Sequence, residues 1–149
     1  MKRFFTPDLL TPRASLGLLA LRVLPGIALM NHGFGKIQHP FSWMGPDATV
    51  PSFLQGLAAL SEFGGGLALV LGLLTPLAML GILCTMGYAA YVHISGGDPF
   101  VGFPRSWEPA SLFFIIALTV LLAGPGRYSL DALLFARRAP EPLPETALR

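Results

Sequence analysis

The sequence has few charged residues and almost no cysteine. Only 12% of its 149 residues are charged, whereas a soluble domain averages about 25%. Short chains expose much of their surface and need polar side chains in water, so this composition excludes an ordinary soluble globule. The single cysteine, Cys84, excludes an intramolecular disulfide and cysteine-rich metal sites. The net charge of +2 is small and divided between the two ends, which excludes a typical nucleic-acid-binding protein.

Apolar residues are abundant instead, at 53% of the chain, and the mean hydropathy is +0.63. A membrane-spanning helix needs roughly 20 mostly apolar residues. Four stretches qualify, some only with their flanks: 15–35, 52–74, 76–93 and 109–123. We therefore predict an all-α integral membrane protein, an antiparallel four-helix bundle followed by a short interfacial helix. The predicted organisation is a cytoplasmic segment (1–14), a transmembrane domain (15–135) and a disordered tail (136–149).

Turn-forming residues separate these stretches. Thr75 is predicted to cap the third helix, with Pro76 at its first position, so the second and third helices form a tight hairpin. The Gly-Pro-Gly run at 124–126 ends the fourth helix. Ser129 then begins a short amphipathic helix, 130–138, which we expect to lie in the membrane interface.

The positions of lysine and arginine predict the orientation, because these residues accumulate on the cytoplasmic side. The termini carry seven of them: Lys2, Arg3, Arg13, Arg127, Arg137, Arg138 and Arg149. The two longer loops carry Lys36 and Arg105. We therefore expect a multi-pass protein of the cytoplasmic (inner) membrane with both termini in the cytoplasm. A cleaved signal peptide is disfavoured, since prolines interrupt the N-terminal run and no cleavage site follows it.

Two charged residues fall inside predicted spans. Arg22 lies in the first and Glu62 in the second. Each costs about 3 kcal/mol near a helix centre unless it is paired or hydrated. Because their predicted depths differ by roughly one helical turn, we predict a buried ion pair between them. It either fixes the helix register or is the catalytic centre of the protein, with Glu62 accepting a proton.

Small residues line both of these helices. One face of the first is predicted to carry Arg22, Gly26, Leu29, Gly33 and Lys36. The second has a row of Gly64, Ala68 and Gly72 for close helix contact. Such rows serve packing within one chain or between copies, so homo-oligomerisation stays open.

The outer half of the bundle collects ionisable groups. The predicted ligand-binding residues at its mouth are His32, Lys36, His93 and Glu108, with Glu62 deeper. A quinone needs an apolar slot, hydrogen-bond donors for its oxygens and a proton acceptor, which this set offers. Haem ligation by two histidines and a zinc or di-metal carboxylate site are weaker alternatives, and no metal site is predicted. A nucleophilic triad and a phosphate-binding loop are missing from the sequence.

These residues, in this order, resemble the DoxX family of small four-helix membrane proteins over residues 16–135. The resemblance rests on four motifs: Arg22-x-x-x-Gly26, His32-Gly33-x-x-Lys36, Glu62-x-x-Gly65-Gly66 and Gly126-Arg127-x-Ser129-Leu130-Asp131. The loop 36–51, with Trp43 and Pro46, matches nothing in the family pattern.

The resemblance implies a membrane subunit linked to quinol oxidation or thiosulfate:quinone oxidoreduction, with a membrane or peripheral redox protein as partner. We do not expect the chain to turn over alone. A non-catalytic adaptor or assembly factor, and a small transporter or proton path, are the alternatives. Arg127 and Asp131 are expected to be structural. They form an ion pair beneath the bundle or, as we favour, Asp131 stabilises the first turn of the last helix.

Overall fold

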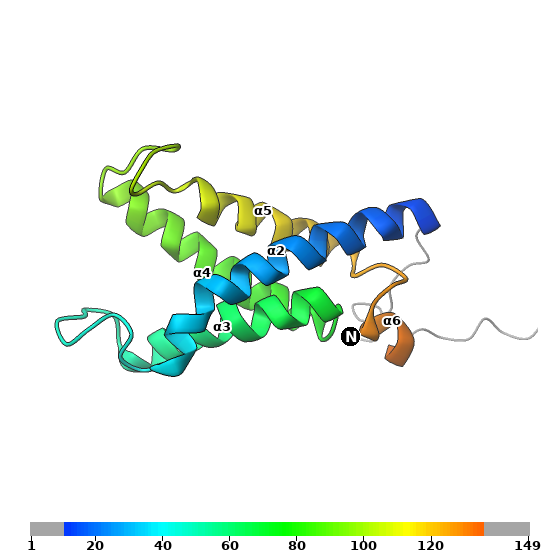
Figure 1. Ribbon diagram of the computed structural model, residues 1–149, viewed down its shortest axis with the longest axis horizontal. Coiled ribbons are helices and arrows are strands. Elements are labelled where there is room, and N and C mark those ends of the chain that lie inside the picture. The colour runs from blue at the N-terminus through cyan, green and yellow to red at the C-terminus, as the bar shows by residue number, and fades with distance from the viewer. Residues whose placement is uncertain (1–10, 136–149) are drawn as a thin grey trace, which may run out of the picture.

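A computed structural model describes residues 11–135, and every regular element in that range is a helix. In chain order they are α2 (Pro12–Gln38), α3 (Ser52–Leu71), α4 (Thr75–Ser95), α5 (Glu108–Ala123) and α6 (Leu130–Phe135). The first four run alternately in opposite directions, as the colour gradient in Figure 1 shows. The predicted all-α, antiparallel four-helix bundle with a short helix after it is confirmed. The tail predicted for 136–149 lies outside the described residues, as do residues 1–10.

Three of the helices, α2, α3 and α4, are long and apolar enough to cross a membrane. Helix α5 is apolar but has only 16 residues. Large leucine side chains stand exposed on the outside of the helices, with Leu24 at 73%, Leu77 at 66% and Leu122 at 77% of their full exposure. An apolar outer surface of this kind suits a lipid environment, where helices satisfy their own backbone hydrogen bonds.

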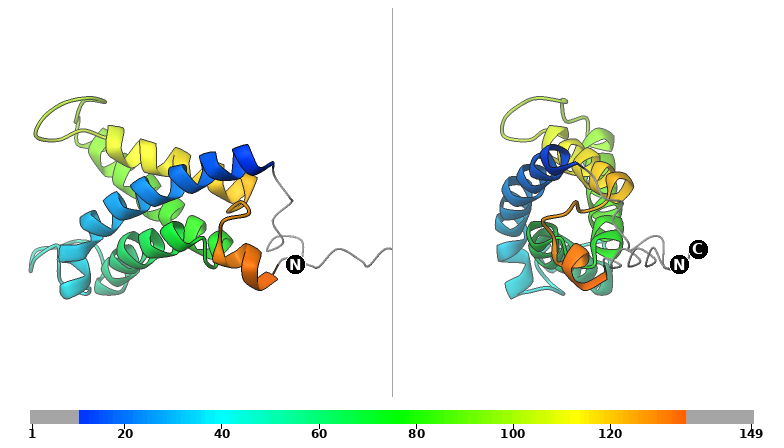
Figure 2. Two further views of the ribbon diagram at one scale, coloured as in Figure 1. Left: turned by 45° about the vertical axis from the view of Figure 1, so that its right-hand side comes forward. Right: turned by 90° about the vertical axis from the view of Figure 1, so that its right-hand side faces the viewer.

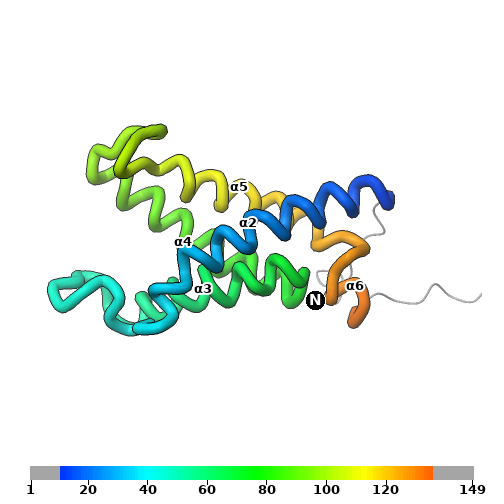
Figure 3. Tube along the Cα trace, in the orientation of Figure 1, coloured from blue at the N-terminus to red at the C-terminus, as the bar shows by residue number. Residues whose placement is uncertain are grey.

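The bundle consists of two helical hairpins, α2 with α3 and α4 with α5. At one end their loops, 39–51 and 96–107, lie apart in every view (Figures 1 and 2). At the other end the chain after α5 turns back beneath the helices and places α6 near the end of α3 (Figure 3). We call the loop end the outer end and the α6 end the inner end, following the predicted orientation.

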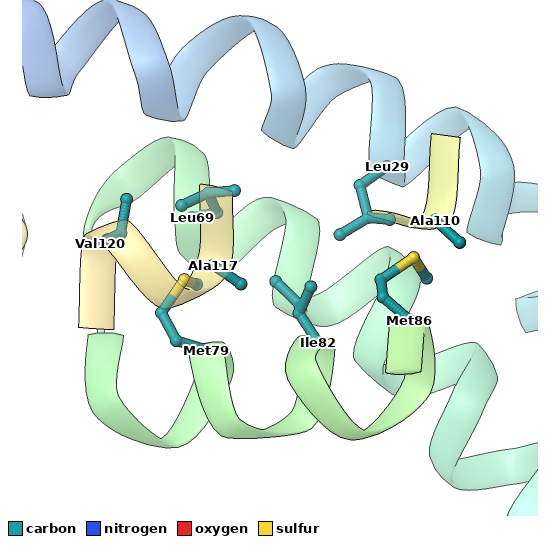
Figure 4. Close-up of a cluster of buried hydrophobic side chains, with 8 residues drawn as sticks. All are labelled: Leu29, Leu69, Met79, Ile82, Met86, Ala110, Ala117 and Val120. Atoms are coloured by element: carbon teal, nitrogen blue, oxygen red, sulfur yellow. The ribbon is translucent and has the colours of Figure 1, made fainter. Parts of the chain in front are cut away.

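A small apolar core holds the hairpins together. Its buried side chains come from all four long helices and are shown in Figure 4: Leu29, Leu69, Met79, Ile82, Met86, Ala110, Ala117 and Val120. Two of these residues, Ala110 and Ala117, are small alanines of α5, so this helix packs closely against the other helices of the core. Burial of apolar surface therefore holds the hairpins together along α5, from Ala110 in its first turn to Val120 in its last.

Glycines bring α2 and α3 into backbone contact. A methyl group on Gly26 would lie 2.8 Å from the carbonyl oxygen of Gly66, and one on Gly33 would lie 2.5 Å from the backbone nitrogen of Phe63. The predicted face of α2 is confirmed, because four of its members are buried and Lys36 is half-buried. Of the predicted row on α3, Gly72 meets the Arg22 side chain of α2, but Gly64 meets only Leu60 of its own helix, and Gly66 makes the backbone contact with α2 instead.

Candidate functional site

A buried ion pair lies between α2 and α3 in the outer half. The Nζ atom of Lys36 is 2.5 Å from Oε1 of Glu62 and donates a hydrogen bond to it. The Glu62 side chain is 4% exposed and that of Lys36 is 26% exposed. Gly33 makes this arrangement possible, since a methyl group there would lie 2.9 Å from Cβ of Glu62. The pair is therefore a carboxylate held inside the helix contact by an ammonium that reaches the surface.

One oxygen of this carboxylate is unused. Oε2 of Glu62 is buried and accepts no hydrogen bond from any residue that the structure describes. A buried acceptor without a donor costs about 1–3 kcal/mol, and more when it is charged. Native proteins rarely leave such a group unsatisfied. Oε2 is therefore a buried acceptor for which the described residues supply no donor.

The loop 39–51 completes the surroundings of the pair. The ring of Trp43 lies against the Lys36 ammonium, with Nζ 4.5 Å from the ring centroid. The indole Nε1 donates a hydrogen bond of 3.0 Å to the carbonyl oxygen of Gln55 in α3. Neither residue was among the predicted site residues. The signal for Gln55 was available, because it precedes Glu62 by seven residues and so lies on the same helix face.

The predicted ion pair between Arg22 and Glu62 is wrong. The Arg22 guanidinium is fully buried, and its Nη2 donates a 2.5 Å hydrogen bond to the carbonyl oxygen of Tyr128. It packs against Gly72, at the end of α3, where any side chain would collide with it. Glu62 lies ten residues before Gly72, or about 15 Å along the helix. This distance exceeds the reach of an arginine side chain, and Lys36 takes the position that we expected for Arg22.

Asp131 fastens the inner end of the bundle. Its two carboxylate oxygens accept hydrogen bonds of 2.8 Å from the backbone nitrogens of Leu74 and Thr75, at the start of α4. Its own backbone nitrogen donates to the carbonyl oxygen of Gly72. The prediction that Thr75 caps α4 is wrong, since Leu74 is the N-cap and no side chain of the turn bonds there. A carboxylate from α6 supplies the cap instead.

Arg127 and Asp131, both expected to be structural, make separate contacts. Asp131 stands in the first turn of α6, as we favoured. Arg127 is exposed, and its backbone nitrogen donates to the hydroxyl of Ser15 in α2. The ion pairs of the described part of the chain do not include one between Arg127 and Asp131. The segment after α5 is thus tied to α2, α3 and α4.

The remaining predicted ligand residues lie elsewhere at the outer end. His32 is exposed and touches the ring of Phe113 edge-on, with centroids 5.7 Å apart. His93 Nδ1 lies 2.7 Å from Oδ2 of Asp98, which also binds Arg105. Glu108 is half-buried in the first turn of α5. The structure brings Lys36 to Glu62 within the α2–α3 hairpin but leaves His93 on the α4–α5 hairpin, whose loop lies apart from the loop 39–51 (Figure 1).

No cluster of three or more histidine, cysteine, aspartate or glutamate side chains within residues 11–135 could hold a metal ion. The outer site itself offers three kinds of group. An ammonium donates hydrogen bonds, a half-used carboxylate accepts a hydrogen bond or a proton, and an indole provides a flat apolar wall.

Comparison with known proteins agrees with the resemblance seen in the sequence. The DoxX family model matches residues 17–94, just over half of the chain. The segment 124–131, on which part of the resemblance rests, lies outside that match. Inner membrane protein YqjF of Escherichia coli is 33% identical over 128 residues, which cover 80% of this chain and 92% of that protein. The uncharacterized membrane protein Rv3486 of Mycobacterium tuberculosis is 29% identical over 88% of this chain and 89% of its own.

An uncharacterized protein of Haemophilus influenzae is 28% identical over 80% of this chain and 92% of its own. No solved structure matches the chain. Its apolar helices and its relatives make it a multi-pass protein of the inner membrane. The chain therefore belongs to the DoxX family.

Proposed function

We propose that this chain is a membrane subunit associated with quinone-linked redox chemistry and that the Lys36–Glu62 pair is its ligand site. The observation that supports the proposal is the buried, unpartnered Oε2 of Glu62 beside the Lys36 ammonium. A partly exposed lysine next to a buried carboxylate gives a ligand a way in. Other buried side-chain atoms of the described residues also lack a partner, among them Oγ of Ser61 and two nitrogens of Arg22, but Oε2 is the one that belongs to a carboxylate.

The two side chains match the two forms of the ligand. Lys36 donates a hydrogen bond to a ring carbonyl oxygen, and Glu62 Oε2 accepts one from a ring hydroxyl. When a quinol is oxidised, it loses two electrons and two protons. Glu62 takes the proton of the hydroxyl that faces it, and the other proton leaves to water at the outer surface. A partner redox protein takes both electrons, so the chain contributes binding and proton acceptance.

Lys36 also replaces Arg22 in this proposal. We expected Arg22 to hold the Glu62 carboxylate in its charged form, but the arginine belongs to the inner end. The site is therefore smaller than predicted and lies on one hairpin. His93 and Glu108, on the other hairpin, have no assigned role in it.

Fluorescence quenching tests the proposal directly. The chain has two tryptophans, so a Trp107→Phe background leaves Trp43 as the reporter beside Lys36. Titrating a short-chain ubiquinone analogue into this protein in detergent should give saturable quenching. Glu62→Gln should weaken the apparent Kd by about tenfold or more, the effect of losing a charge-assisted hydrogen bond.

A matched control removes a carboxylate at the same end of the bundle. Glu108→Gln makes the same chemical change on the α4–α5 hairpin and should leave the Kd unchanged. Quenching that does not saturate, or equal effects of Glu62→Gln and Glu108→Gln, would reject the Lys36–Glu62 pair as the ligand site.

We also propose that both termini are cytoplasmic, since seven of the nine basic residues outside the predicted spans (15–35, 52–74, 76–93 and 109–123) lie in the terminal segments. In a Cys84→Ala background, Ser42→Cys should react with a membrane-impermeant maleimide in intact cells, and Arg127→Cys should react only after lysis. The reverse pattern would invert the orientation and move the Lys36–Glu62 pair to the cytoplasmic half.

The proposed partner is a membrane or peripheral redox protein. Crosslinking in native membranes should recover the chain with such a protein. Recovery with a partner that has no redox centre would support the adaptor alternative, and recovery of a second copy alone would indicate a homo-oligomer.

A further inference from the structure

Gln55 ties the loop 39–51 to α3. Its side chain is 3% exposed and both ends of its amide are used. Oε1 accepts a 3.2 Å hydrogen bond from the backbone nitrogen of Met44, and Nε2 donates a 2.9 Å bond to the carbonyl oxygen of Val50. Its backbone oxygen accepts the indole hydrogen bond of Trp43. One buried residue therefore holds the loop at three points.

The same loop has an apolar anchor nearby. The ring of Phe41 lies on Gly56, where a methyl group would come within 2.6 Å of the ring. Gly56 is the neighbour of Gln55 in α3, so polar and apolar contacts fix the loop at the same height. Trp43 lies between these attachments along the chain, and its ring has little freedom to move away from α2.

The position of the Trp43 ring determines where the Lys36 ammonium can lie. The ring centroid is 4.5 Å from Nζ, and the same Nζ is 2.5 Å from Glu62. Lysine has a flexible side chain with several rotamers, so an aromatic face on one side and a carboxylate on the other restrict it to a single arrangement. A chain of contacts thus runs from Gln55 through Trp43 and Lys36 to Glu62.

We propose that Gln55 is a positioning residue of the ligand site: it fixes Trp43 so that Lys36 stays against one oxygen of Glu62 and the other oxygen remains free for the ligand. The ligand in this inference rests on the proposed function, whereas the role of Gln55 in fixing Trp43 and the loop 39–51 does not. It also assigns a role to the loop 39–51, which is to form the outer wall of the site.

Two measurements on the Trp107→Phe protein test it. The first is acrylamide quenching of Trp43 without ligand, and the second is the Kd of the short-chain ubiquinone analogue. Gln55→Met keeps the side-chain length but removes both amide bonds, so it should raise the quenching constant about twofold and weaken the Kd roughly three- to tenfold, as loss of one or two hydrogen bonds does. Gln55→Glu keeps an acceptor for Met44, so its quenching constant and its Kd should fall between those of Gln55→Met and the parent. If Gln55→Met does not fold, Gln55→Glu still tests the inference.

Ser61→Ala is the matched control, because Ser61 is a polar residue of α3 whose buried hydroxyl has no partner and faces Gly81 of α4. It should change neither measurement. Combining Gln55→Met with Lys36→Met separates positioning from a general loss of structure. If Gln55 acts through Lys36, it should have no further effect on the Kd once Lys36 is replaced.

The outcomes are distinguishable. Unchanged quenching of Trp43 in Gln55→Met, or the same fold-loss in Kd with and without Lys36, would overturn the inference. If the parent protein binds no quinone but Gln55→Met still exposes Trp43, the proposed function fails and the role of Gln55 in fixing the loop stands.

Discussion

Replacing Asp131 should loosen the inner end of the bundle by an amount that its contacts allow us to work out. Its carboxylate accepts two backbone hydrogen bonds of 2.8 Å at the start of α4, and it is 1% exposed. Charge-assisted bonds of this kind contribute about 1.5–3 kcal/mol each. Asp131→Asn keeps one acceptor oxygen, so it should lower the free energy of unfolding by about 1.5–3 kcal/mol. Asp131→Ala removes both bonds and leaves two buried backbone donors without an acceptor, so about 3–6 kcal/mol is expected.

Denaturation of the full chain in detergent micelles measures these losses. Asp47→Asn, which changes an exposed carboxylate in the loop 39–51, is the control and should stay within about 0.5 kcal/mol of the parent. Arg22→Met combined with Asp131→Asn should cost less than the two changes added together, since both residues contact Gly72 at the end of α3. A loss below about 1 kcal/mol for Asp131→Ala, or strict additivity with Arg22→Met, would refute the reasoning.

Two further changes test other contacts. Gly33→Ala should destabilise the protein by about 1–3 kcal/mol in the same assay, because its methyl group would lie 2.5 Å from the backbone nitrogen of Phe63. Gly35→Ala is the control and should be neutral or slightly stabilising, because no atom lies within 4 Å of the added methyl group. Asp98→Asn should cost less than about 1 kcal/mol and less still in high salt, because its partners His93 and Arg105 are 30% and 62% exposed. A larger loss that salt does not reduce would show that this ion-pair cluster supports the α4–α5 hairpin.

The helices could be predicted from the sequence because the thickness of a bilayer limits the length of an apolar run. All four spans were placed within three residues of their observed ends. The buried face of α2 could be predicted as well, since the spacing of Gly26, Leu29 and Gly33 follows the helical repeat. These features depend on local patterns, which a single sequence contains.

The partners of the charged residues could not be predicted in the same way. We assigned Arg22 to Glu62 from estimated depths, but close glycine contacts set the register of α2 against α3. Gly33 faces Glu62, and Gly26 faces Gly66, so Arg22 comes opposite the end of α3. The glycines were visible in the sequence, but which of them touch depends on the crossing of two helices. The contacts of Asp131 with α4 join residues more than fifty positions apart, and no local pattern indicates them.

The carboxylate that caps α4 has a consequence for biogenesis. The ribosome synthesises Asp131 after all four long helices. The backbone nitrogens at the start of α4 therefore have no carboxylate to bind until α6 has been synthesised. A nascent chain that stops before Asp131 would hold every apolar span and would still insert into the membrane. It would lack the contacts of Asp131 with the end of α3 and the start of α4. Membrane proteases would therefore recognise a truncated product by its loosely packed inner end, although its hydrophobic segments are intact.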